Sequence, residues 1–110
     1  FPTANLVPPS SKRLPMFGVY VSRVKLEGRL YRGVTDIGKK PTVEGDNPVG
    51  VETYIFDLNR DIYGVVIEVQ LLAFIRGEMR FDSIEDLKAQ IGRDKERARQ
   101  YFEEHRELIS

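Results

Sequence analysis

The sequence predicts one α+β domain, in which antiparallel strands form a barrel and a C-terminal helical segment covers it. Its 110 residues are the usual size of a single domain. Apolar and polar residues alternate through much of residues 19–75, as in half-buried strands, whereas apolar residues recur at helical spacing in residues 83–108. Strands followed by helices are typical of the α+β class, and several short strands joined by turns favour a barrel because closure removes exposed edges.

The composition excludes several kinds of site and partner. Lys and Arg together number 17, as do Asp and Glu, so the formal net charge of zero disfavours a general attraction to nucleic acid or anionic lipid. The absence of cysteine excludes disulfides and thiolate metal sites, and the single histidine, His105, excludes a His-rich metal site. No apolar run approaches the roughly 20 residues that span a bilayer, and residues 1–5 are not a basic and apolar leader. We therefore expect a cytoplasmic protein with no nucleic-acid or membrane partner.

The first part of the chain predicts a loop and then a hairpin. Four of the six prolines lie in residues 1–18, which we predict to be an extended loop. Residues 19–26 and 30–37 both have strand character, and the turn signal Glu27-Gly28 lies between them. This pattern predicts a β-hairpin.

Two further strands follow a long loop. Residues 38–50 are rich in Gly, Pro, Asp and Asn, and loops of this length in small domains are often functional. Residues 51–58 alternate again, and residues 59–61 form a turn signal. Residues 65–75 are apolar and rich in β-branched side chains, which predicts the longest and most central strand of the sheet.

The last third of the chain predicts helices. Asp82 or Ser83 is a good N-cap, with acidic residues three positions later, and Ile84, Leu87 and Ile91 then fall at helical spacing. The mixed charges farther along the helix indicate a solvated face.

A break is expected within this helical segment. Gly92 weakens a helix by about 1 kcal/mol relative to alanine, so we predict a kink there. Asp94 could cap a second segment that runs to about Leu108. The predicted inner stripe of that segment consists of Ala98, Tyr101, Phe102 and His105.

The side chains that remain after these exclusions suit phosphoryl transfer, although no P-loop motif is present. Thr3 and Asn5 are two positions apart, so in an extended segment they share a face and could ligate a hard cation beside phosphate oxygens. On physical grounds alone, a loop in which these side chains cap turns is the simpler interpretation. Glu52 on a strand could accept a proton from a substrate hydroxyl, or could simply be an exposed carboxylate. Arg76 and Phe81 could hold a ligand, or belong to a surface connector whose Phe81 plugs the barrel end.

Taken in order, these segments resemble the riboflavin kinase family, whose domain occurs alone in eukaryotes and as the C-terminal module of bacterial bifunctional FAD synthetases. The resemblance covers nearly the whole chain. It rests on FPTAN (1–5), GVY (18–20), IGKKPT (37–42), VETYI (51–55), DIYG (61–64) and FIR (74–76), with Glu78 and FDS (81–83). Each motif is weak alone, but the series in this order is specific.

The resemblance implies a mainly β fold, a closed six-stranded antiparallel Greek-key barrel with a C-terminal helical segment. It implies transfer of the ATP γ-phosphate to the 5′-hydroxyl of riboflavin, giving FMN and ADP. Thr3 and Asn5 would hold Mg²⁺ and the nucleotide phosphates, and Glu52 would be the catalytic base. The expected walls of the flavin site are Arg76, Phe81, Ile84 and Leu87.

Two departures from the family pattern affect these expectations. The chain begins inside the first motif, so residues 1–110 are expected to be an N-terminally truncated domain that lacks the first strand, and a version extended upstream is expected to be more stable and active. Asp36 stands where the family often has Asn. The parent chain could also carry an N-terminal adenylyltransferase domain.

Two other functions remain open at this point. One is a barrel of the same family that binds flavin or nucleotide without turnover, although the presence of Thr3, Asn5 and Glu52 counts against it. The other is an oligonucleotide-binding barrel, against which the zero net charge and the lack of a basic, aromatic stripe both count.

Overall fold

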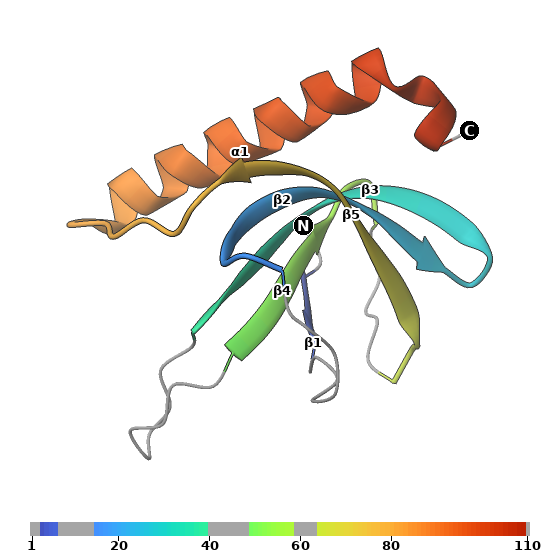
Figure 1. Cartoon of the computed structure of the whole chain (residues 1–110), viewed down its shortest axis with the longest axis horizontal. Helices are drawn as coiled ribbons and strands as arrows, with labels where there is room; N and C mark the ends of the chain where they lie inside the picture. Colours follow the sequence, from blue (N-terminus) through green and yellow to red (C-terminus); the bar gives the residue numbers. More distant parts are fainter. Residues whose placement is uncertain (1–2, 7–14, 40–48, 59–63, 110) are drawn as a thin grey trace.

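The fold is one antiparallel sheet with a long helix lying across it (Figure 1). The computed structural model describes residues 3–6, 15–39, 49–58 and 64–109, and for residues 3–6 it describes the backbone. The strands are β1 (Thr3–Leu6), β2 (Gly18–Leu26), β3 (Arg29–Lys39), β4 (Val49–Ile55) and β5 (Ile67–Arg76). The helix α1 (Ile84–Glu104) and a short 3₁₀ helix, η1 (Arg106–Leu108), complete the chain. The predicted mainly β fold with a C-terminal helical segment is therefore confirmed.

The predicted closed six-stranded barrel is wrong. The described residues form a five-stranded sheet in the order β1-β4-β3-β2-β5. A sheet closes into a barrel only when its two edge strands pair with each other. Within the described residues β1 pairs with β4 alone and β5 pairs with β2 alone, so the sheet is strongly bent but open.

The hairpin is confirmed, and its turn has the expected geometry. Strands β2 and β3 pair from Gly18 opposite Ile37 to Leu26 opposite Arg29. Both turn residues between them have positive φ, 51° at Glu27 and 81° at Gly28. A two-residue turn of this kind has the twist that joins antiparallel strands without splaying them.

Three other strand predictions need correction. The predicted loop of residues 1–18 contains strand β1, because a short extended segment can pair with β4 despite the prolines that flank it. The strand predicted at 51–58 begins at Val49 and ends at Ile55, before Asp57 adopts a left-handed φ of 61°. The loop predicted at 38–50 lies partly in β3 and β4, and residues 40–48 and the predicted turn 59–61 lie outside the described residues.

Strand β5 is an edge strand rather than the central one, and β3 is longer. Its apolar run has a different cause, because β5 packs on both sides. Leu72, Ala73 and Ile75 pack against the hydrophobic cluster under the helix. Val65, which precedes the strand, and Ile67 and Val69, which lie in it, pack against a second hydrophobic cluster. A run that is partly buried on both faces resembles a central strand in sequence.

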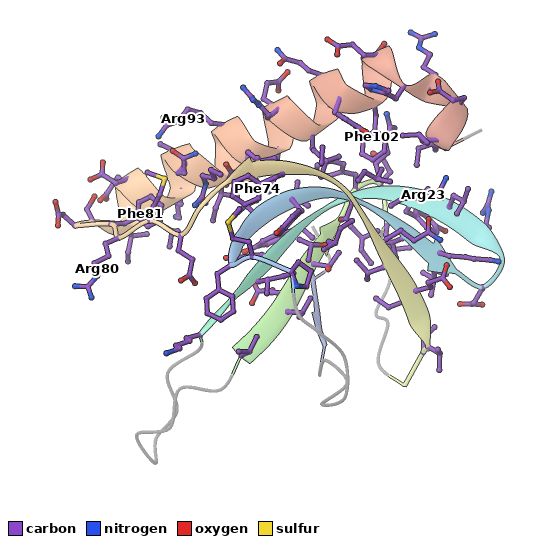
Figure 2. All side chains as sticks on the ribbon, viewed as in Figure 1. Arg23, Phe74, Arg80, Phe81, Arg93 and Phe102 are labelled. Atoms are coloured by element: carbon purple, nitrogen blue, oxygen red, sulfur yellow. The ribbon has the colours of Figure 1, made fainter. Side chains whose placement is uncertain are left out.

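Two hydrophobic clusters occupy opposite faces of the sheet. The cluster under α1 consists of Val19, Val21, Val34, Phe56, Ala98 and Phe102. Phe102 points from the helix toward the sheet, whereas Arg93 points away from it (Figure 2). The second cluster consists of Val24, Leu26, Ile55 and Leu58. Beside it, the Thr35 hydroxyl on β3 donates a hydrogen bond of 2.8 Å to the Ser22 hydroxyl and shares another of 2.8 Å with the Thr53 hydroxyl, so these fully buried hydroxyls have partners.

Helix α1 begins where the sequence predicts but does not break. Ser83 is the N-cap, and its hydroxyl accepts a hydrogen bond of 3.1 Å from the Asp86 amide. The helix continues through Gly92, so the predicted kink is wrong, and Asp94 is an internal, buried residue rather than a cap. The burial of Ala98 and Phe102 against the sheet holds the second half of the helix in line with the first. Packing therefore outweighs the weak local propensity of one glycine.

The continuous helix makes a prediction about Gly92. A Cβ at this position would meet nothing within 4 Å. Because alanine has the higher helix propensity, Gly92→Ala should raise the free energy of unfolding by about 0.5–1 kcal/mol. Urea denaturation followed by circular dichroism measures this change. A loss of stability would show that residue 92 is not in a regular helix.

Candidate active site

The strand register places several candidate residues in one row across the sheet. Asn5 on β1 lies opposite Glu52 on β4, Glu52 lies opposite Asp36 on β3, and Asp36 lies opposite Val19 on β2. Val19 in turn lies opposite Arg76 on β5. We call these five positions the cross-strand row. They come from segments far apart in the chain, so only the sheet topology brings them together.

A cavity of about 250 Å³ lies between this row and the first half of α1. Its strand side is lined by Val19, Val34, Asp36, Glu52, Tyr54 and Arg76. The connector between β5 and α1 adds Glu78, Met79 and Phe81, and the helix adds Leu87, Ile91, Asp94 and Lys95. Phe81 lies beside the start of the helix (Figure 2). The cavity therefore combines a polar strand side with an apolar wall.

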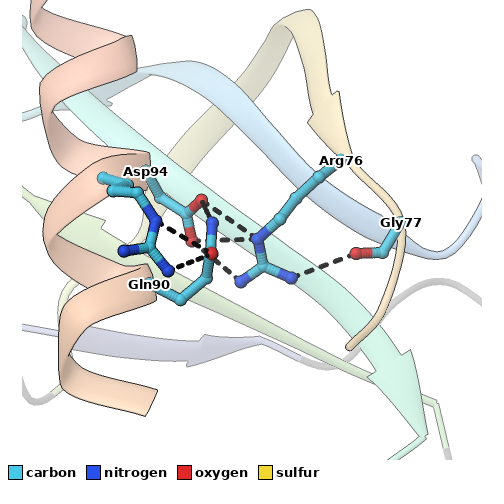
Figure 3. Close-up of polar contacts among 5 residues, drawn as sticks. Arg76, Gly77, Gln90 and Asp94 are labelled. Carbon is cyan, nitrogen blue, oxygen red and sulfur yellow. Dashed lines mark hydrogen bonds and ion pairs between the residues drawn. The ribbon is translucent and has the colours of Figure 1, made fainter. Parts of the chain in front are cut away.

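An ion pair fixes the helix to the end of β5 (Figure 3). The Arg76 guanidinium donates to both carboxylate oxygens of Asp94, from Nε at 3.0 and 3.2 Å and from a terminal nitrogen at 2.8 Å. The amide of Gln90 donates to the same carboxylate at 3.0 Å, and Arg76 also donates to the Gly77 carbonyl at 3.0 Å. Asp94 is only 4% exposed. This arrangement fixes the connector that forms one wall of the cavity.

Tyr54 and Lys95 lie together in the lining of the cavity. Burial raises the pKa of Tyr54 to about 12, with further contributions from the charge of Glu52, a hydrogen bond with Glu52, and the charge of Asp36. Tyr54 is therefore a neutral phenol at physiological pH. The Lys95 ammonium lies over the Tyr54 ring, 5.5 Å from its centroid, and partial burial and the charge of Arg99 lower the pKa of Lys95.

The connector also contacts the end of strand β3. A Cβ added at Gly38 would overlap the carboxylate of Glu78. Glycine at this position therefore leaves room for a connector side chain to reach the strand end. Gly38 and Glu78 both belong to segments that the sequence analysis singled out, and here they lie in contact.

The structure brings together four of the predicted site residues. Glu52, Arg76, Phe81 and Leu87 all line the cavity. Ile84 does not line it and is 66% exposed. Thr3 and Asn5 lie on β1 opposite Tyr54 and Glu52 in the register. The roles assigned to these residues remain predictions.

Several residues that line the cavity were not predicted from the sequence. For two of them, Tyr54 and Lys95, the periodicity of the sequence could have indicated their position. Tyr54 lies two residues after Glu52 on the same strand, so it shares a face with it. Lys95 continues the helical stripe of Leu87 and Ile91 by one further turn, although the charged run around it suggested only a solvated face. Asp36 was noted as a departure from a motif, but its position opposite Glu52 depends on strand pairing.

The donor chemistry at this end of the sheet is compatible with a hard cation bound together with phosphate oxygens. No group of three or more His, Cys, Asp or Glu side chains that could hold a metal occurs among the described residues. Mg²⁺ in nucleotide sites is typically held by one or two protein oxygens plus phosphates, so such a group is not required. The hydroxyl of Thr3 and the amide of Asn5 are oxygen donors of the right kind.

Comparison with known proteins assigns the chain to a family. A family model described as riboflavin kinase matches residues 1–102. The chain belongs to the riboflavin kinase family. Its curated relatives include the bifunctional riboflavin kinase/FMN adenylyltransferases of Escherichia coli K12, 44% identical over 103 residues, and of Bacillus subtilis 168, 38% identical over 104 residues. Each alignment covers 93% of this chain, with 32% of the first protein and 33% of the second.

The chain thus spans about a third of the length of these relatives. It also resembles a crystal structure described as a macrolide-efflux protein from Streptococcus pneumoniae, with 40% identity and a TM-score of 0.78. That match covers 89% of this chain and 32% of the other. None of the helices in the described residues has the length and apolar character needed to cross a membrane.

Proposed function

We propose that this chain is a riboflavin kinase domain that transfers the γ-phosphate of ATP to the 5′-hydroxyl of riboflavin. The observation that carries the proposal is the cavity in which the Glu52 carboxylate on a strand shares the lining with the apolar side chains Met79, Phe81 and Leu87. An aromatic ring system with a hydroxylated tail needs such a combination of apolar wall and polar floor. Membership of the family supports the assignment of the reaction.

In this proposal Glu52 accepts the proton of the attacking hydroxyl. A bond forms between the ribityl oxygen and the γ-phosphorus, and the bond from that phosphorus to the oxygen bridging the β- and γ-phosphates breaks. ADP leaves with the bridging oxygen, and the hydroxyl proton goes to Glu52. Because a neutral hydroxyl is a weak nucleophile, an adjacent carboxylate assists by orienting it and accepting its proton. The Tyr54 phenol, neutral at physiological pH, helps to hold the carboxylate.

The apolar wall would hold the flavin ring. Phe81 and Leu87 are the two apolar residues among the predicted wall residues that line the cavity, and Met79 and Ile91 extend the same surface. The partial exposure of Leu87, 38%, and of Met79, 49%, leaves apolar area for a ligand to cover. Arg76 contributes through its ion pair with Asp94, which holds the connector against the helix.

Thr3 and Asn5 would hold Mg²⁺ together with the nucleotide phosphates. Their backbone positions opposite Tyr54 and Glu52 put them beside the proposed base in the register. The cation, when bound, supplies charge neutralisation to the transferring phosphoryl group. The partners are therefore ATP and riboflavin.

The proposal extends to the longer protein that contains this domain. The relatives are named for a second activity, FMN adenylyltransferase, and this chain matches about a third of their length. We propose that the parent protein is a cytoplasmic bifunctional enzyme whose other module carries that second activity.

Chromatography of a reaction with riboflavin, ATP and Mg²⁺ tests the proposed function. We expect FMN and ADP in equal amounts, and no FMN when ATP is omitted or when Mg²⁺ is chelated. Absence of FMN from folded protein that still binds riboflavin would instead establish a non-catalytic flavin-binding domain.

A further inference from the structure

Two carboxylates lie in direct register on the strand side of the cavity. Asp36 on β3 lies opposite Glu52 on β4, and both side chains line the cavity. Directly opposite residues in an antiparallel pair share a face, with Cβ atoms roughly 4.5–5.5 Å apart. The same two charges both raise the pKa of Tyr54. The negative charge on this side of the cavity is therefore concentrated around the proposed base.

The charges of the described lining residues do not balance. Arg76 and Asp94 neutralise each other in a short ion pair. The other charged lining residues are the acidic Asp36, Glu52 and Glu78 and the basic Lys95. Among the described lining residues outside this ion pair, acidic groups outnumber basic ones by three to one. An anionic group that enters the cavity without a cation meets a repulsive field.

The pairing of Asp36 with Glu52 also lowers the stability of the fold. Like charges directly opposite each other in a sheet are destabilising. Glu52 is needed in the proposed reaction, but the reaction assigns no step to Asp36. A second carboxylate at this position therefore calls for a role that does not involve accepting the proton.

We infer that Asp36 is a specificity residue, whose negative charge beside Glu52 repels a phosphorylated flavin from the cavity while leaving binding of the neutral alcohol unchanged. The inference rests on the proposed function, in which the substrate is uncharged at its hydroxyl and the product is a phosphate monoester. Such a monoester carries about −1.5 to −2 charges at pH 7. Asp36 therefore opposes retention of the product more than binding of the substrate.

Binding measurements on an isosteric variant test this inference. Riboflavin and FMN are each titrated, by quenching of flavin fluorescence, into the wild type, Asp36→Asn and Glu96→Gln, without nucleotide or divalent cation. Asp36→Asn should bind FMN about five-fold more tightly, with the riboflavin Kd unchanged. Glu96→Gln removes an exposed helix charge outside the cavity and should match the wild type. An unchanged ratio of the two Kd values in Asp36→Asn would overturn the inference.

The wild type alone provides a second measurement, which does not depend on how the variant folds. Because salt screens repulsion, raising the salt concentration should tighten FMN binding and leave riboflavin binding unchanged. Weaker FMN binding at high salt would mean that the cavity attracts the phosphate, which contradicts the inference. A wild type that makes no FMN and binds neither flavin contradicts the proposed function itself. A wild type that makes FMN, with no change in Asp36→Asn, contradicts only the role of Asp36.

Discussion

Replacing Glu52 with glutamine should lower the turnover of FMN formation by about 10²–10⁴-fold, which is the usual contribution of a general base. Glutamine keeps the size and hydrogen-bonding capacity of the side chain but cannot accept the hydroxyl proton. Because the cavity wall is unaltered, the Kd for riboflavin should change little. Steady-state kinetics and riboflavin titration on the same preparation separate the two effects.

The control for this experiment is Glu96→Gln, which removes a charge from an exposed part of α1 and should keep wild-type turnover. If Glu52→Gln kept turnover within a few-fold of the wild type, Glu52 would not be the base. If it lost riboflavin binding in the same proportion as turnover, Glu52 would bind substrate rather than take part in the chemical step.

Replacing Asp94 with alanine should lower the free energy of unfolding by about 3–5 kcal/mol, because it leaves the Arg76 guanidinium largely buried without its partner. A loss of this size is a large part of the stability of a domain this small. It should also loosen the connector, so the riboflavin KM should rise in whatever protein remains folded. Urea denaturation measures the first effect and kinetics the second.

A double substitution, Arg76→Met with Asp94→Leu, is the matched control. It removes both charges and fills the space with apolar side chains, so it should recover much of the lost stability. If Asp94→Ala were as stable as the wild type, the ion pair would not be what fastens α1 to the end of β5.

The elements that the sequence predicted well are those whose signals are local. The alternation of residues 19–26 and the Glu27-Gly28 turn are sufficient to define a hairpin, and Ser83 at the start of an apolar stripe is sufficient to begin a helix. The failures are non-local. The pairing of β1 with β4 and the edge position of β5 depend on which strands meet, and the pattern of a single segment does not contain that information.

Local and non-local signals also separate the site residues that were predicted from those that were missed. Glu52, Phe81 and Leu87 were predicted from chemistry and from motif resemblance, and the structure places them around one cavity. Asp36 was not assigned a role, because its relation to Glu52 exists only through the pairing of β3 with β4. For Arg76, the sequence indicated a ligand contact, but its strongest bonds are to Asp94, eighteen residues later.

In the proposed mechanism the cavity presents the riboflavin hydroxyl to Glu52, and a crystal structure of the chain with riboflavin and ADP would show this contact. We predict that the flavin ring lies against Phe81 and Leu87, with the 5′-oxygen about 2.6–3.2 Å from a carboxylate oxygen of Glu52. A second cavity lies between β5 and α1, lined in part by Phe74 and Tyr101. Flavin bound there, with Glu52 out of reach of the ribityl chain, would contradict the proposed mechanism.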